Sequence, residues 1–202
     1  METWIETRSG IKVDVQDPKP EQFDIKDIAY ALSNTCRFNG HSAGFYSVAE
    51  HSVAVALRLP THLRLAGLLH DATEAYLGDI PSPIKQFLPD YKAIEARFET
   101  ALAEKFATVE HSVIPRCTAE EYKLVKQADI DALYTEAHFL IESQGKDWSY
   151  FQGPVAYKVN YDLQPICLPP KEAFKLFLGM YYDIVGVSND TKKEAPRIVL
   201  AA

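Results

Sequence analysis

Residues 63–74 read LRLAGLLHDATE, an apolar run that ends in the dipeptide His70-Asp71. The spacing of its leucines and alanines predicts an amphipathic helix over Leu63 to Tyr76, with one face in a core. An imidazole and two carboxylates, those of Asp71 and Glu74, therefore follow a stretch that is expected to be buried. Such nitrogen and oxygen donors suit a divalent metal ion.

Two more polar residues fall on helix faces that are otherwise apolar. His51 has a valine three residues before it and another four after it, in a helix expected over Ser47 to Leu59. Asp129 has apolar residues four positions before and after it, in a helix expected over Ala119 to Ser143. A single buried histidine is more often a hydrogen-bonded core residue than a ligand, but a buried carboxylate is costly unless it is paired or binds a metal. We predict that one divalent ion is shared by His51, His70, Asp71 and Asp129.

The order in which these four residues occur resembles the signature of the HD-domain metal-dependent phosphohydrolases. Further motifs extend the resemblance, namely Arg37-Phe38, Glu50-His51-Ser52, His70-Asp-Ala-Thr-Glu74, Gly78-Asp-Ile-Pro-Ser-Pro-Ile-Lys85 and Val125-Lys-Gln-Ala-Asp129. They are similar to those of the bacterial 5'-deoxynucleotidases and of short phage-type deoxynucleoside triphosphate hydrolases, including the dATP-specific kind. The resemblance covers about Ile25 to Glu142. It implies a mostly α fold, an HD-domain helical bundle, with a bound divalent ion and a small nucleotide substrate.

Glu74 and Asp79 are the candidate catalytic carboxylates. Glu74 lies one helical turn after His70 and three residues after Asp71, so we expect it to face the same cavity without binding the metal. In that position it can orient or deprotonate the attacking water. Its alternative role is that of a partner for Lys85 or of a solvated carboxylate. The resemblance places Asp79 near the sugar hydroxyl of the substrate.

Three cations are candidates for binding phosphate. The guanidinium of Arg37 can hold two phosphate oxygens at once, and Lys85 offers a mobile point charge. The resemblance places Arg37 next to the phosphate. Lys126, three residues before Asp129, is expected either to reach the outer phosphates of a triphosphate or to be a solvated helix lysine.

Phe38 and His41 are the remaining candidate substrate contacts. In the deoxynucleotidase pattern a tryptophan follows the arginine and helps to exclude a ribose 2'-hydroxyl, whereas this chain has Phe38. The smaller ring leaves discrimination between deoxy- and ribonucleotides open. His41 lies in a glycine-containing loop and either contacts the substrate or, as we favour, is held by a backbone hydrogen bond.

Composition limits the class of protein and its partners. With 202 residues and 47% hydrophobic content, the chain is expected to form a single domain over residues 1–202. A formal charge of -7 without a block of lysine or arginine disfavours nucleic acid polymers but permits a small nucleotide. Three separated cysteines, with no leader and no apolar span, predict a cytoplasmic protein that does not bind membranes. We also expect a homo-oligomer.

The remaining patterns outline the other elements. Alternation around Ser9-Gly10 predicts a β-hairpin within an N-terminal extension of residues 1–20. Further helices are expected over residues 25–34, 90–107 and 171–185, and side-chain caps are expected at Asp24, Ser47 and the pair Thr118 and Glu121. Residues 148–170 are expected to form an ordered aromatic loop, and residues 188–202 a tail that is either mobile or docked.

Two other functional classes fit the same scaffold less well. Dinuclear members of the wider HD family, such as di-iron oxygenases, have extra histidines between the His-Asp pair and the last aspartate, but only His111 lies there in this chain. A non-catalytic nucleotide sensor has no need of a water-orienting carboxylate such as Glu74. We therefore expect a hydrolase that acts on the 5' phosphate of deoxynucleotides, with one tightly bound Co, Mn, Zn, Fe or Mg ion.

Overall fold

The computed structural model describes residues 2–152 and 157–186 of the chain. As predicted it is mostly helical, with α1 (Ile25–Asn34), α2 (Val48–Leu57), α3 (Arg64–Leu68), α4 (Glu74–Leu77), α5 (Ser82–Lys85), α6 (Pro89–Phe106), α7 (Ala119–Leu140) and α8 (Pro170–Ile184). The predicted hairpin is confirmed, since β1 (Trp4–Glu6) and β2 (Lys12–Asp14) pair antiparallel with Ile5 opposite Val13. Short 3₁₀ turns occupy residues 20–22, 37–40, 61–63, 149–151 and 161–163. None of the described helices is both long enough and apolar enough to cross a membrane.

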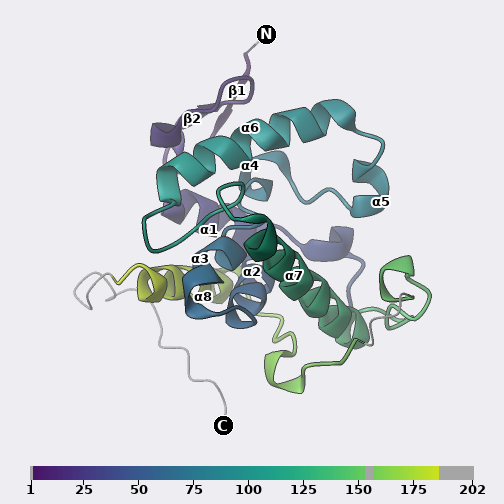
Figure 1. The fold of residues 1–202 in the computed structure, drawn as a ribbon. Coiled ribbons are helices and arrows are strands. Elements are labelled where there is room, and N and C mark those ends of the chain that lie inside the picture. The colour runs from purple at the N-terminus through teal and green to yellow at the C-terminus, as the bar shows by residue number, and fades with distance from the viewer. Residues whose placement is uncertain (1, 153–156, 187–202) are drawn as a thin grey trace.

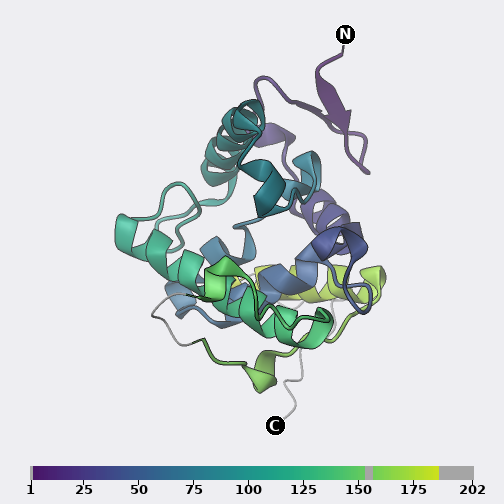
Figure 2. The same ribbon diagram turned by 90° about the vertical axis from the view of Figure 1, so that its right-hand side faces the viewer.

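Helix α2 lies at the centre of the fold and contacts α1, α3, α7 and α8. In Figure 1, α7 runs diagonally across the front of the molecule, and α6 lies across the top near the purple N-terminal hairpin. Figure 2 shows the hairpin at the edge of the molecule, away from α7. One apolar cluster, with Ile28, Val53 and Phe177, joins α1, α2 and α8, and a second, with Val55 and Ala132, joins α2 to α7.

Side-chain caps determine where three helices begin. The side chains of Asp24 and Ser47 accept hydrogen bonds from backbone N–H groups in the first turns of α1 and α2. Thr118 and Glu121 form the predicted capping box at the start of α7. These helix starts are confirmed, and the cap at Ser47 fixes the start of α2 about one turn before His51.

The prediction of a single continuous helix over Leu63 to Tyr76 is wrong. Helix α3 ends at Leu68, and α4 begins only at Glu74 after an intervening turn. The imidazole Nδ1 of His70 lies 2.8 Å from the carbonyl oxygen of Gly67. In a continuous helix that oxygen would accept the N–H of the residue after His70. The side chain therefore competes with the helical hydrogen bond, and the resulting turn carries the His-Asp pair.

Other expectations differ from the structure by less. Helix α7 ends at Leu140 and not at residue 143, because Ile141 adopts extended backbone angles. The motif from Gly78 to Lys85 lies outside the expected helices, but its last four residues form the short helix α5. The aromatic loop over residues 148–170 is confirmed for its described residues, in which the rings of Trp148 and Phe151 stack. The tail expected over residues 188–202 lies outside the described residues.

Helices α2 and α3 pack closely at Gly67. A Cβ atom at this position would lie 3.1 Å from Cα of Ala56 and 2.5 Å from Cδ1 of Leu59. Ala56 is in α2, and Leu59 follows the end of that helix. The lack of a side chain at Gly67 therefore lets α3 approach α2 closely enough for His70 to reach His51.

Replacement of Gly67 by alanine is expected to push α3 away from α2 and to lower the free energy of unfolding by roughly 1–3 kcal/mol, the usual range for overpacking. Metal binding should weaken as well, because His70 follows α3 directly. Urea unfolding and a Co²⁺ titration measure the two effects, with the exposed change Thr61→Ala as the control. A Gly67→Ala protein as stable as the parent would contradict this description of the packing.

Candidate active site

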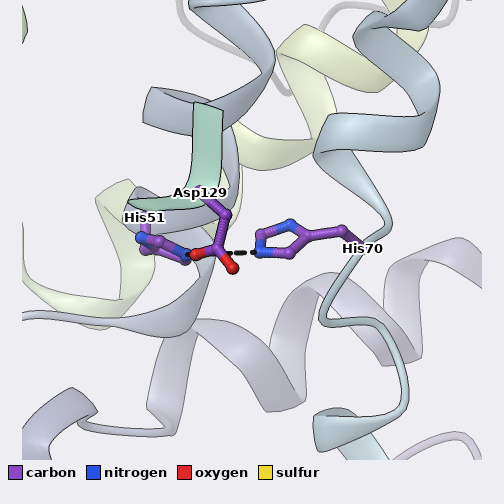
Figure 3. A group of neighbouring side chains, drawn as sticks. All are labelled: His51, His70 and Asp129. Carbon is purple, nitrogen blue, oxygen red and sulfur yellow. Dashed lines mark hydrogen bonds and ion pairs between the residues drawn. The ribbon is translucent and has the colours of Figure 1, made fainter. Parts of the chain in front are cut away.

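Four side chains from three parts of the fold converge. His51 comes from α2, His70 and Asp71 come from the turn after α3, and Asp129 comes from α7. The Nε2 atoms of the two histidines lie 3.3 Å apart, and Oδ1 of Asp129 lies 3.3 Å from that of His51 and 3.7 Å from that of His70. Figure 3 shows the carboxylate of Asp129 between the two imidazole rings. Oδ2 of Asp71 lies 3.1 Å from Nε2 of His70 and 3.5 Å from that of His51.

These separations fit a shared metal ion. Donor atoms about 2.1 Å from one ion lie about 3.0 Å apart in octahedral geometry and about 3.4 Å apart in tetrahedral geometry. Two imidazole nitrogens and two carboxylate oxygens also form a donor set that suits a divalent transition metal. His51, His70 and Asp129 place one donor atom each within 4.8 Å of one another, and Asp71 lies beside this group. Within residues 2–152 and 157–186, no second group of three His, Cys, Asp or Glu donors gathers in this way. The predicted ligands could thus hold one divalent ion.

The charges of the four groups depend on one another. Burial alone would lower the pKa of His70, but Asp71 and Asp129 raise it to about 10. Burial would raise the pKa of both aspartates, but the two imidazoles beside them hold it below the usual range. The carboxylates therefore favour a cation at this point, either a proton or a metal ion. A metal ion that binds here displaces protons, so its binding is expected to weaken at low pH.

Glu74 begins α4, close to the candidate metal ligand Asp71. Its side chain is buried, and Oε2 has no hydrogen-bond partner among the described residues. Burial, and then the nearby carboxylates of Asp71 and Asp79, raise the pKa of Glu74 well above its usual range. A buried carboxyl group with a raised pKa and no partner is a candidate for exchanging a proton with a ligand.

Arg37 brings a positive charge to the same place from the 3₁₀ turn over residues 37–40. Its Nη1 lies 3.6 Å from Oδ2 of Asp71, and its Nε lies 3.3 Å from Oε2 of Glu136. Burial lowers the pKa of Arg37, but the carboxylates of Glu136 and Asp71 raise it above its ordinary value. The guanidinium is therefore a permanent cation beside the candidate metal ligands.

Glu136 is a site residue that no sequence motif indicated. It is 2% exposed, and its Oε1 lies 2.6 Å from Nδ1 of His51 and accepts a hydrogen bond from the hydroxyl of Tyr46 at 2.9 Å. Burial raises its pKa, but His51 and Arg37 lower it to about 2, so the carboxylate is ionised. A weak signal does exist in the sequence. Glu136 follows Asp129 by about two helical turns, which places both on one face of α7.

The amino-acid sequence matches a known family over more than half of its length. The family of YfbR-like 5'-deoxynucleotidases matches residues 41–159. The chain belongs to this family. The match includes all four candidate metal ligands as well as Glu74 and Glu136, whereas Arg37 and Phe38 precede it. The predicted resemblance to the bacterial 5'-deoxynucleotidases is confirmed.

Individual relatives share different parts of this YfbR-like chain. The YfdR protein of Escherichia coli K12, described only as uncharacterized, is 35% identical over 182 residues, which are 90% of this chain and 96% of YfdR. A 5'-deoxynucleotidase of Vibrio atlanticus is 39% identical over 114 residues, 44% of this chain and 59% of its own length. A 5'-deoxynucleotidase of Pasteurella multocida is 32% identical over 128 residues, 50% of this chain and 66% of its own length. The chain thus aligns over more of its length with YfdR than with these two relatives named for an activity.

Asp79 and Phe38 both lie near Arg37. Burial raises the pKa of Asp79, and the nearby charge of Arg37 acts in the opposite direction. The ring of Phe38 lies 5.6 Å from the guanidinium carbon of Arg37 and 6.3 Å from the ring of Trp148. Phe38 has a φ of 57°, a left-handed conformation that costs about 1–3 kcal/mol for a residue other than glycine. Such strain is common at ligand sites, and here it holds an aromatic ring beside the arginine.

The other predicted substrate contacts have partners of their own. His41 is exposed, and its backbone N–H donates to the carbonyl oxygen of Phe38 at 2.9 Å. This bond does not involve the imidazole, so the role of that side chain stays a prediction. Lys85 on α5 forms an ion pair with Glu95 on α6. Nζ of Lys126 lies 3.4 Å from Oδ2 of Asp129. Of these three residues, Lys126 is the one with a direct contact to the donor cluster.

Replacement of any one of the four donors by alanine is expected to lower bound metal and abolish turnover, because the site has no redundant donor. Asp129→Ala is the sharpest case, and elemental analysis after dialysis measures its metal content. Asp131→Ala is the control on the same helix, where Asp131 accepts a hydrogen bond from exposed Gln127. The assignment fails if Asp129→Ala keeps the full metal content of the parent.

Proposed function

We propose that this protein is a divalent-metal-dependent phosphohydrolase that removes the 5' phosphate of deoxynucleotides. The observation that carries the proposal is that the donors of His51, His70 and Asp129, with Asp71 beside them, lie next to the buried cation Arg37. Glu74 is close by, and its Oε2 has no hydrogen-bond partner among the described residues. Hydrolysis of a phosphate ester is helped by a metal ion, by a charged contact to phosphate and by a proton acceptor for water. The names of the family and of its relatives support a deoxynucleotide as the substrate.

Residues of this chain would bind the ion, the attacking water, the phosphate and the sugar hydroxyl. When bound by His51, His70, Asp71 and Asp129, a divalent ion supplies a Lewis acid that polarises phosphoryl oxygens and lowers the pKa of a water. Glu74 orients the attacking water and takes its proton. Arg37 neutralises the phosphate oxygens, and Asp79 positions the sugar hydroxyl.

The bond changes are those of a phosphomonoester hydrolysis. The water oxygen bonds to phosphorus, and the bond between phosphorus and the 5' oxygen breaks. The 5' oxygen leaves with a proton, so the products are a deoxynucleoside and orthophosphate. The ring of Phe38 is assigned to the sugar, because it lies directly beside Arg37.

The position of Lys126 supports a second candidate, the hydrolysis of a deoxynucleoside triphosphate. Its side chain is 45% exposed and lies beside Asp129, so it can turn toward phosphates beyond the first. Cleavage at the same 5' oxygen would then release tripolyphosphate in place of orthophosphate. Lys85 can join the phosphate contacts only if it leaves Glu95.

Several finer assignments belong to the same proposal. Mixed imidazole and carboxylate donors favour Co, Mn, Zn or Fe over Mg as the bound ion. The substrate is a free nucleotide, because a net charge of -7 repels nucleic acid polymers. We also propose a single domain, a homo-oligomeric assembly and a cytoplasmic location, the last consistent with three free cysteines. Sedimentation of the purified protein tests the assembly.

Incubation of metal-loaded protein with the mono- and triphosphates of all common nucleosides and deoxynucleosides tests the proposed function. Orthophosphate and tripolyphosphate are measured separately, and orthophosphate from deoxynucleoside monophosphates is the expected product. Tripolyphosphate would favour the second candidate. Tight nucleotide binding without any product would contradict both candidates and support a sensor, and a product that requires dioxygen would support a di-iron oxygenase.

Glu74→Ala is expected to lower the rate by about a hundredfold or more while metal and nucleotide still bind, because the side chain acts on the water and not on the ion. Metal content and nucleotide affinity are measured alongside kcat. Glu104→Ala, an exposed carboxylate on α6, is the control. Loss of metal as severe as in Asp129→Ala would show that Glu74 is a ligand instead.

Arg37→Ala and Phe38→Ala are expected to have different kinetic signatures. Loss of Arg37 removes a charged contact to phosphate, so kcat/KM should fall for every nucleotide alike. Loss of the Phe38 ring should narrow the gap between deoxy- and ribonucleotides and leave the best deoxy substrate within roughly tenfold of its rate. Steady-state kinetics on one matched deoxy/ribo pair measure both. An unchanged deoxy/ribo ratio in Phe38→Ala, or normal rates in Arg37→Ala, would refute these roles.

A further inference from the structure

The carboxylate of Glu136 contacts three groups from different segments of the chain. Its Oε1 lies 2.6 Å from Nδ1 of His51 and 2.9 Å from the hydroxyl of Tyr46, and its Oε2 lies 3.3 Å from Nε of Arg37. Because the residue is almost fully buried, water does not replace these partners. A buried carboxylate shared in this way constrains the geometry of the groups that it contacts.

The contact with His51 determines which ring nitrogen can bind a metal ion. Oε1 of Glu136 already accepts a hydrogen bond from the hydroxyl of Tyr46, so at the 2.6 Å contact it is the acceptor, and Nδ1 of His51 carries the proton. In the neutral imidazole the lone pair then lies on Nε2, the atom that faces the other candidate ligands. Carboxylates that bind the second nitrogen of a metal-binding histidine fix its tautomer and ring orientation.

The contact with Arg37 uses the other carboxylate oxygen. Nε is the guanidinium atom nearest to Glu136, whereas Nη1 lies 3.6 Å from Oδ2 of Asp71. Nε and Oε2 form an ion pair without hydrogen-bond geometry, so charge attraction between the two buried groups holds the Nε side of the guanidinium toward Glu136. The N–H groups on the Nη atoms are then left for a phosphate. Asp71 is itself a candidate metal ligand. Without Glu136, its carboxylate would attract the guanidinium of Arg37 to itself.

We propose that Glu136 is a positioning residue that couples phosphate binding to the metal centre, because one carboxylate sets both the tautomer of His51 and the orientation of Arg37. The phosphate half rests on the proposed function, whereas the metal half concerns the donor cluster alone. A purely structural ion pair would stabilise the fold and leave metal affinity and phosphate affinity unchanged. Measurements of the two affinities therefore distinguish the positioning role from a structural one.

The first experiment is a Co²⁺ titration without nucleotide on Glu136→Gln. Glutamine keeps the size of the side chain but removes its charge. Its amide N–H groups would face an N–H donor, on His51 or on Arg37, and two donors cannot form a hydrogen bond. We expect the affinity for cobalt to fall by about ten- to hundredfold. Tyr46→Phe is the matched control, because it removes only the third partner of the same carboxylate, and we expect it to keep the parent affinity. Circular dichroism and thermal unfolding establish that each variant is folded.

A second variant covers the case in which Glu136→Gln does not fold. Glu136→Asp keeps the charge but draws the carboxylate back from His51 and Arg37 by one methylene group. Its cobalt affinity is again expected to fall below that of the parent. Parent-like cobalt affinity in either folded variant would overturn the metal half of the proposal, whatever the substrate proves to be.

The phosphate half is tested by a double-mutant cycle of Glu136→Gln and Arg37→Ala on cobalt-loaded protein. Calorimetry measures the affinity for inorganic phosphate, so the result does not depend on turnover of any nucleotide. If Glu136 acts through Arg37, the double variant loses less affinity than the product of the two separate losses. Independent, multiplicative losses would overturn this half, as would a parent protein that does not bind phosphate. Failure of the proposed function would appear separately, in the nucleotide assay.

Discussion

The imidazole of His51 is completely buried in the central helix α2, and both of its ring nitrogens need partners there. Nδ1 meets Glu136 from α7, and Nε2 faces His70, Asp71 and Asp129. These partners are in place only when α3 and α7 both pack against α2. The apolar clusters that hold the three helices together therefore also assemble the candidate metal site.

The residue before His51 performs a different task. The carboxylate of Glu50 accepts hydrogen bonds from the backbone N–H groups of residues 166–168, at distances of 2.6 to 3.1 Å. These bonds attach the loop before α8 to the helix that carries the candidate metal ligand His51, and α8 itself packs on α1 and α2. Of these two adjacent side chains of α2, Glu50 therefore stabilises the fold, and His51 belongs to the candidate metal site.

Much of the fold could be predicted from the sequence because the decisive interactions are local. The capping box at Thr118, for example, needs only the first turn of its own helix. The break after Leu68 could not be predicted, because it depends on a side-chain bond from His70 to the backbone. The candidate metal ligands were predicted from buried polar positions together with a family motif. Glu136 was not, because its partner His51 lies 85 residues earlier and no short motif joins them.

The central claim is that one divalent ion is held by His51, His70, Asp71 and Asp129 beside the cation Arg37. Anomalous X-ray diffraction from crystals grown with Co²⁺ and inorganic phosphate tests it most directly. We predict one anomalous peak about 2.0–2.2 Å from a donor atom of each of the four residues, with phosphate density next to Arg37. A cobalt peak with other ligands, or none at these donors in protein that is active with cobalt, would contradict the claim.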